Sequence, residues 1–187
     1  MKTFKYNRRC DSSEAVILHL DGDRKYSRRA FQFYSSLNIN AIVENIPEYK
    51  QEIMVYDLLR KYNPDILVST GHDSMYRRGQ KFYEMENYKN SKYFVNTVRK
   101  ARLWKSSEEE LVIFAGACES FYEAIMAEGA NFASSPKRIM IDYMDPLIVA
   151  SKVALTPKNK YITIREVSPF LKGGIAGIGG TKAIGKR

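Results

Sequence analysis

The sequence predicts an α/β protein of three layers, in which helices cover both faces of a mostly parallel sheet. Short apolar runs alternate along the chain with amphipathic stretches, as they do in repeated βαβ units. Two of the runs, residues 66–68 and 111–115, are apolar throughout, which is typical of parallel strands buried on both faces. A chain of 187 residues can bury a substantial core, so a single domain is expected.

The first half of the chain is expected to contain three strands and two helices. Apolar residues between Tyr26 and Leu37 recur on one helical face. The next helix opens at Pro47, because proline suits the first helical position, and it ends at Asn63-Pro64. The expected strands are residues 15–20, 41–45 and 66–69.

The second half is expected to open with a long loop over residues 74–90, which lack a clear period. Asp145 is suited to cap a helix that has Pro146 at its first position and runs to about residue 154. Thr163 and Glu166 fit a capping box for a last helix, closed by Gly173-Gly174. The remaining expected elements are helices at 91–102 and 120–128 and strands at 111–115, 131–133 and 138–141.

The expected organisation is one domain flanked by two short segments. Residues 1–13 are polar and form an N-terminal extension, and residues 14–172 form the folded domain. Residues 173–187 are rich in glycine and offer few side chains to pack, so we expect a flexible tail.

Composition narrows the class of protein. No apolar run approaches the roughly 18 residues of a membrane span, and the N-terminus lacks the apolar core of a secretory signal. Two cysteines do not make a disulfide framework, which favours a reducing compartment. No phosphate-binding loop and no cluster of metal-ligand spacing is present, so we expect neither cofactor nor metal. The net charge of +9 is the only feature that favours nucleic-acid binding, and charge alone does not identify a nucleic-acid site. We therefore expect neither nucleic-acid nor membrane binding.

The candidate chemistry lies at the ends of two apolar strands. The run from Ile66 ends in Gly71-His72, and the run from Leu111 ends in Ala117-Cys118. The carboxyl ends of parallel strands meet at one sheet edge, which is where open α/β sheets carry their sites. A helix beginning just after Cys118 would favour the thiolate, the form that attacks a carbonyl carbon. The pair therefore predicts a cysteine nucleophile, Cys118, with His72 as its base.

The order of these residues resembles the caspase-like superfamily of cysteine peptidases, which includes clostripain, gingipain and legumain. In that superfamily a strand ending in His precedes a strand ending in Ala-Cys, at a spacing close to the one here. The chain departs from the usual His-Gly pair, because Asp73 follows His72. We therefore expect the backbone N–H groups of Asp73 and Cys118 to form the oxyanion hole.

Several longer motifs resemble the YabG family of sporulation-specific cysteine proteases from spore-forming Firmicutes. The resemblance implies a caspase-like peptidase domain over residues 14–172 that cleaves spore coat and cortex-processing proteins after arginine and processes itself. It also implies a location in the cytoplasm of the sporulating cell, at or near the forming coat. The motifs are LHLDGD at 18–23, PDILVSTGHD at 64–73, NYKNSKYFV at 87–95, VIFAGAC at 112–118 and GANFASSP at 129–136.

Cleavage after arginine requires a carboxylate, because a guanidinium is best bound by a bidentate acid. Asp21 and Asp23 follow the first strand at the same sheet edge as the dyad and are the first candidates. Asp73 and Glu119, beside the dyad in sequence, are rivals. Ser134 and Ser135 follow a short strand and are weaker candidates for lining the cleft.

A different class of function is also compatible with the pattern. Flavodoxin-like and receiver-like binding modules use the same sheet edge, and the Asp21-Gly22-Asp23 acids are typical of a receiver pocket. The sequence does not indicate the oligomeric state.

Overall fold

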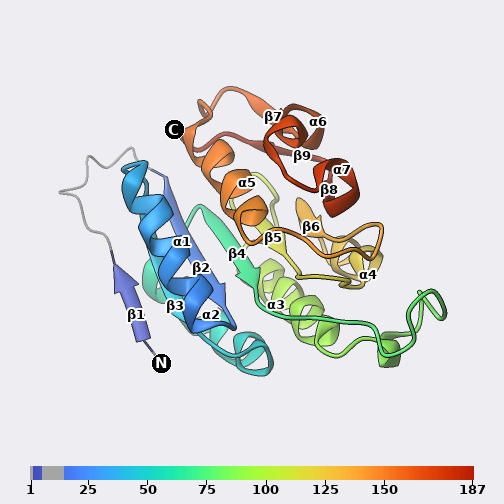
Figure 1. The fold of residues 1–187 in the computed structure, drawn as a ribbon. Coiled ribbons are helices and arrows are strands. Elements are labelled where there is room, and N and C mark those ends of the chain that lie inside the picture. Colours follow the sequence, from blue (N-terminus) through green and yellow to red (C-terminus); the bar gives the residue numbers. More distant parts are fainter. Residues whose placement is uncertain (1, 6–14) are drawn as a thin grey trace.

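The computed structural model describes residues 2–5 and 15–187 and confirms the three-layer α/β class (Figure 1). The described strands of the central sheet have the order β1-β3-β2-β4-β5-β6-β8. The inner pairs are parallel, and the outer strands β1 and β8 pair antiparallel with β3 and β6. These strands are β1 (Lys2–Lys5), β2 (Val16–Asp21), β3 (Asn40–Asn45), β4 (Ile66–Thr70), β5 (Val112–Ala115), β6 (Phe132–Ser134) and β8 (Ile178–Gly180).

Helices pack on both faces of the sheet because its strands alternate their apolar side chains between two cores. On β2, Ile17 faces a core shared with α1 and α5, whereas Leu18 and Leu20 face one shared with α2, α3 and α4. Figure 1 shows α1 and α5 together on one face. The helices are α1 (Arg24–Ser36), α2 (Glu48–Tyr62), α3 (Ser91–Trp104), α4 (Tyr122–Ala127) and α5 (Met144–Leu155).

Short elements complete the chain after α5. The predicted capping box is present, with Thr163 and Glu166 bonded reciprocally. The helix that it opens is short, because Pro169 has no N–H to continue the helical hydrogen bonds. The short elements are η1 (Met85–Asn87), β7 (Tyr161–Thr163), α6 (Ile164–Val167), η2 (Ser168–Phe170), α7 (Gly174–Gly177) and β9 (Lys182–Ile184).

The glycine-rich segment 173–187 differs from the expected flexible tail. It forms α7, β8 and β9, and β8 pairs with β6 at the sheet edge. A Cβ at Gly179 would lie 2.7 Å from the Tyr122 ring, so the glycine permits close packing. The buried Asp145 carboxylate accepts hydrogen bonds from the Lys172 and Gly173 N–H groups and fixes the start of the segment.

The structure also differs from the expected strand at residues 138–141 and from the expected N-terminal extension. Residues 138–141 form no strand, because their backbone groups bond to side chains and to the turn after β5 rather than to a neighbouring strand. Of the expected N-terminal extension 1–13, residues 2–5 form β1, and residues 1 and 6–14 lie outside the described residues. None of the helices in the described ranges is long and apolar enough to cross a membrane.

The segment between β4 and α3 is a long loop that packs beside the turn after β5. Its Met75 and Tyr88 form a small apolar cluster with Phe121. The Arg138 guanidinium lies over the Tyr88 and Phe121 rings and pairs with Glu123. The loop is thereby joined to the segment that follows β6.

Candidate active site

The candidate site lies where three adjacent parallel strands end. Asp21 at the end of β2 pairs with Thr70 at the end of β4, and Ser69 of β4 pairs with Ala115 at the end of β5. The residues that follow these strands therefore meet at one edge, as the sequence predicts. Asp21, His72 and Cys118 line a single pocket of about 220 Å³.

The opposite wall of this pocket comes from α1 and from the segment leading into α5. Tyr26 of α1 stacks on Tyr143, with ring centroids 5.3 Å apart. Met140, Ile141 and Pro146 add apolar surface. The pocket is smaller than the roughly 300–1,000 Å³ of sites for drug-sized ligands, so its size suits a single side chain.

Cys118 lies in a turn rather than directly before a helix. The chain leaves β5 through Gly116, whose φ of +106° favours glycine, and α4 begins only at Tyr122. The helix predicted at 120–128 is present as α4, but it begins two residues later, so its N-terminus does not directly follow Cys118 as expected. The half-buried Cys118 sulfur instead accepts a hydrogen bond from the Ile141 N–H at 3.4 Å.

The buried Asp73 carboxylate fixes the turn that carries Cys118. Its Oδ2 accepts the hydroxyl of Ser120, whose oxygen in turn accepts the Ala117 N–H. It also accepts the Ser91 hydroxyl and backbone N–H groups from the loop. Burial raises the pKa of Asp73, and these hydrogen bonds oppose that shift. The Asp73 side chain therefore holds the turn and the loop together, and it does not line the pocket.

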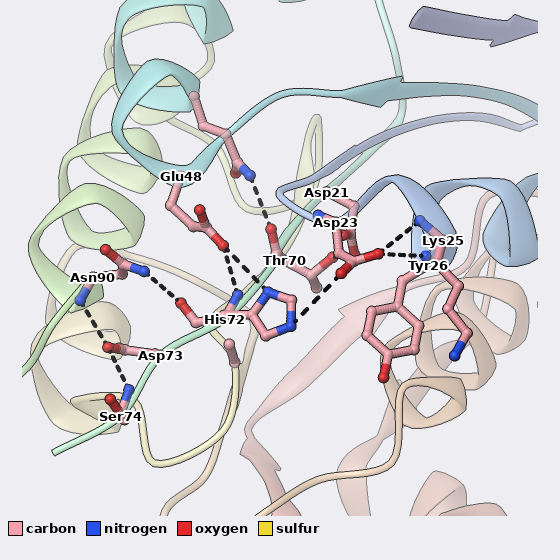
Figure 2. Close-up of polar contacts among 12 residues, drawn as sticks. Asp21, Asp23, Lys25, Tyr26, Glu48, Thr70, His72, Asp73, Ser74 and Asn90 are labelled. Carbon is pink, nitrogen blue, oxygen red and sulfur yellow. Dashed lines mark hydrogen bonds and ion pairs between the residues drawn. The ribbon is translucent and has the colours of Figure 1, made fainter.

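The His72 ring is exposed and lies between two carboxylates (Figure 2). Its Nε2 is 3.8 Å from Asp23 Oδ2, and its Nδ1 is 3.8 Å from Glu48 Oε1. The backbone is held more tightly, because the His72 N–H donates to Glu48 Oε1 at 2.6 Å and Asn90 Nδ2 donates to the His72 carbonyl. Within the described residues no hydrogen bond joins the His72 ring to the Cys118 sulfur.

The two acids after β2 have different surroundings. The buried Asp21 accepts the Asp23 N–H and the Thr70 hydroxyl, both at 2.7 Å, and it lines the pocket. Asp23 caps α1 by accepting the Lys25 and Tyr26 N–H groups. The geometry thus distinguishes a pocket acid from a helix cap that also flanks His72.

Two backbone donors beside the dyad are unoccupied. Over residues 2–5 and 15–187, the N–H groups of Asp73 and Cys118 have no hydrogen-bond acceptor. The neighbouring N–H groups of His72, Ala117 and Glu119 are all bonded within the protein. The arrangement leaves the two expected oxyanion-hole donors free to bind a developing negative charge.

The remaining predicted residues lie away from the pocket. The buried Ser134 hydroxyl has no partner among the described residues, and Ser135 bonds to the backbone of Ile139. Glu119 pairs with Arg78 of the long loop, with Glu119 Oε1 at 2.8 Å from Arg78 Nε. These three side chains do not line the pocket.

Sequence reasoning missed Glu48 and the two tyrosines of the pocket wall. Glu48 follows Pro47 in the first turn of α2, where acidic residues are common because they complement the helix dipole. Tyr26 falls within a predicted helix, and Tyr143 follows a predicted strand, so neither position carried a signal of its own. Only the meeting of α1, α2 and the segment before α5 identifies them.

Comparison of the sequence with those of known proteins identifies the family of this chain. A family profile described as YabG peptidase U57 matches residues 2–187. The chain is 38% identical over 169 residues to the sporulation-specific protease YabG of Bacillus subtilis (strain 168). That alignment covers 90% of this chain and 58% of the relative, so the chain spans little more than half the length of that protein. The chain therefore belongs to the YabG peptidase U57 family.

Proposed function

We propose that this domain is a caspase-like cysteine endopeptidase in which Cys118 is the nucleophile and His72 is the general acid and base. The observation that carries the proposal is that both side chains line one pocket at the carboxyl edge of the sheet. Two free backbone N–H groups flank them. The similarity to the sporulation-specific protease YabG of Bacillus subtilis supports the reaction class.

The reaction is acyl transfer through a thioester. His72 takes the Cys118 proton, and the thiolate attacks the scissile carbonyl carbon. The carbonyl oxygen becomes an oxyanion that accepts hydrogen bonds from the Asp73 and Cys118 N–H groups. The imidazolium then protonates the leaving amine as the C–N bond breaks. Water, deprotonated by His72, hydrolyses the thioester and restores the thiol.

The absence of a hydrogen bond between the dyad members is compatible with this reaction. The scissile peptide bond would lie between the sulfur and the ring, and catalytic hydrogen bonds commonly tighten only when substrate is bound. Cys118 and His72 follow the adjacent strands β5 and β4, whose pairing fixes the positions of the two strand ends.

Arginine is the residue that the pocket would take on the acyl side of the scissile bond. The Asp21 carboxylate is held by two hydrogen bonds, and each of its oxygens retains a lone pair for a guanidinium N–H. Tyr26 and Tyr143 line the same pocket and stack on each other, with the Arg29 guanidinium over the Tyr143 ring, so they provide an aromatic wall for the aliphatic part of an arginine side chain. Asp21 is therefore the preferred specificity acid, ahead of Asp23, Asp73 and Glu119.

Membership of the family supports a proposal for the biological setting. The proposed substrates are spore coat and cortex-processing proteins, with cleavage of the chain itself as a further reaction. The proposed location is the cytoplasm of the sporulating cell, beside the forming coat. No cofactor, metal, nucleic acid or membrane enters the proposal.

The test is loss of peptidase activity on removal of the sulfur. Cys118→Ala should reduce kcat/KM on an arginine-containing coat substrate by about 10³-fold or more, because the covalent route is lost. An arginyl chloromethylketone should alkylate Cys118 selectively, as read by peptide mapping. Undiminished cleavage by Cys118→Ala would contradict the role of Cys118 as nucleophile. Absence of cleavage by the wild type would favour a binding module at the same sheet edge.

A further inference from the structure

The first turn of α2 holds the strand end that carries His72. Gln51 is buried, donates to the Thr70 carbonyl and accepts the Ser69 hydroxyl. Glu48, one turn earlier, accepts the His72 N–H at 2.6 Å, a short charge-assisted hydrogen bond. The turn thereby fixes both the last residues of β4 and the backbone of His72.

The Glu48 carboxylate occupies a space that two glycines leave open. A Cβ added at Gly22 or at Gly71 would overlap the Glu48 side chain. Gly22 follows β2 and Gly71 follows β4, so the carboxylate lies in a cradle between two adjacent strand ends. Its side chain is only 14% exposed, which leaves the carboxylate few partners other than His72.

The same carboxylate oxygen also faces the imidazole. Glu48 Oε1 lies 3.8 Å from His72 Nδ1, so a small rotation of the ring brings the two within hydrogen-bond distance (Figure 2). A hydrogen bond from Nδ1–H would fix the tautomer that leaves Nε2 unprotonated and able to accept the thiol proton. The imidazolium formed during acylation would then lie between two carboxylates, Glu48 and Asp23.

We propose that Glu48 is a positioning residue for His72, acting on both its backbone and its ring. The inference rests on the proposed function, since it assigns Glu48 a task in proton transfer by His72. Glu48 touches no reacting atom, and its contribution is to hold the imidazole in the orientation that proton transfer needs.

The experiment compares kcat and KM of the wild type with those of three variants on an arginyl peptide. Glu48→Ala should lower kcat about 10- to 100-fold and change KM less than about threefold, because misorientation affects the chemical step. Glu48→Gln keeps an acceptor for the His72 N–H and should restore most of the lost kcat. Glu52→Ala is the matched control one turn further along α2 and should have wild-type kinetics.

Displacing the carboxylate without removing it gives an independent variant. Gly22→Ala should push the Glu48 side chain aside and lower kcat as Glu48→Ala does. Combined with Glu48→Ala, it should have no further effect, because the group that it displaces is gone. Full additivity of the two substitutions would contradict the proposed cradle.

The possible outcomes distinguish failure of the proposed function from failure of the role given to Glu48. If the wild type shows no cleavage that depends on Cys118, the proposed function fails and this inference fails with it. If cleavage depends on Cys118 but Glu48→Ala keeps the wild-type kcat, only the role of Glu48 is wrong. Equal loss in Glu48→Ala and Glu48→Gln together with a lowered Tm would indicate a merely structural carboxylate.

Discussion

The two histidines of this chain belong to neighbouring strands of the sheet, His19 within β2 and His72 two residues after the end of β4, and their surroundings are opposite. Each has its Nε2 near an aspartate oxygen, at 3.7 Å for His19 and Asp21 and at 3.8 Å for His72 and Asp23. His19 is 1% exposed, whereas the His72 side chain is 60% exposed. Proximity to a carboxylate therefore does not distinguish the two rings, but burial and hydrogen bonding do.

Both nitrogens of the His19 ring are engaged within the core. Thr70 donates its hydroxyl to Asp21, which can only accept, so His19 Nε2–H donates to the Thr70 oxygen. The remaining nitrogen, Nδ1, accepts the Tyr34 hydroxyl, whose pKa is raised by burial. The fold thus holds the His19 ring in one orientation. The histidine that we propose as the general acid and base, His72, is the one whose ring has no hydrogen bond within the described residues.

The largest expected effect comes from replacing each histidine in turn by alanine. His72→Ala should lower kcat/KM by about 10³-fold, the usual worth of a general acid and base, and leave Tm nearly unchanged. His19→Ala should lower the free energy of unfolding by about 2–4 kcal/mol, because it leaves a cavity and an unpaired Tyr34 hydroxyl. Its folded molecules should keep most of their activity. Peptide kinetics measures kcat/KM, and urea denaturation measures the free energy of unfolding. If both variants lost activity and stability to the same extent, the contrast between a reactive and a structural histidine would be wrong.

The meeting of His72 and Cys118 at one sheet edge could be predicted because it depends on strand order and on local signals. The apolar run that starts at Ile66 and the one that starts at Leu111 each end at a small-residue turn, and adjacent parallel strands align their carboxyl ends. The position of His19 within the apolar run 15–20 also indicates a core residue, and the residue is 1% exposed. These features are encoded within a few residues along the chain.

The second expected effect sharpens the same comparison at the acids beside each histidine. Asp21→Asn should lower kcat/KM for arginyl peptides by about 10²-fold and have little effect on peptides with a neutral residue there, because the loss is confined to the guanidinium. Asp23→Asn should preserve the α1 cap, since asparagine caps as well as aspartate, and leave the preference for arginine intact. A loss of preference in Asp23→Asn alone would assign the pocket acid to that residue.

What the sequence could not predict depends on contacts between distant segments. Nothing local announces that Ser120 bonds to Asp73 and delays the start of α4, which removes the expected helix N-terminus behind Cys118. Glu48 is indistinguishable in sequence from an acid that complements the α2 dipole. Gly179 suggests flexibility until the Tyr122 ring is placed against it. Each case requires the tertiary partner to be known.

The smallest expected effect concerns the residue next to His72, whose side chain points the opposite way. Burial raises the pKa of Asp73 above its ordinary 3.8, so the folded state favours the protonated carboxyl. The contribution of Asp73 to the free energy of unfolding is therefore fully present below about pH 3.8 and falls as the pH rises through the folded-state pKa. Asp73→Asn removes this titration. The difference in Tm between the variant and the wild type should consequently rise from pH 4 to pH 7, relative to the exposed control Asp57→Asn measured by calorimetry. If the Tm difference fell as the pH rose, the hydrogen bonds to the Asp73 carboxylate would outweigh the effect of its burial. Exposure alone would then not distinguish the structural role of Asp73 from the proposed catalytic role of His72.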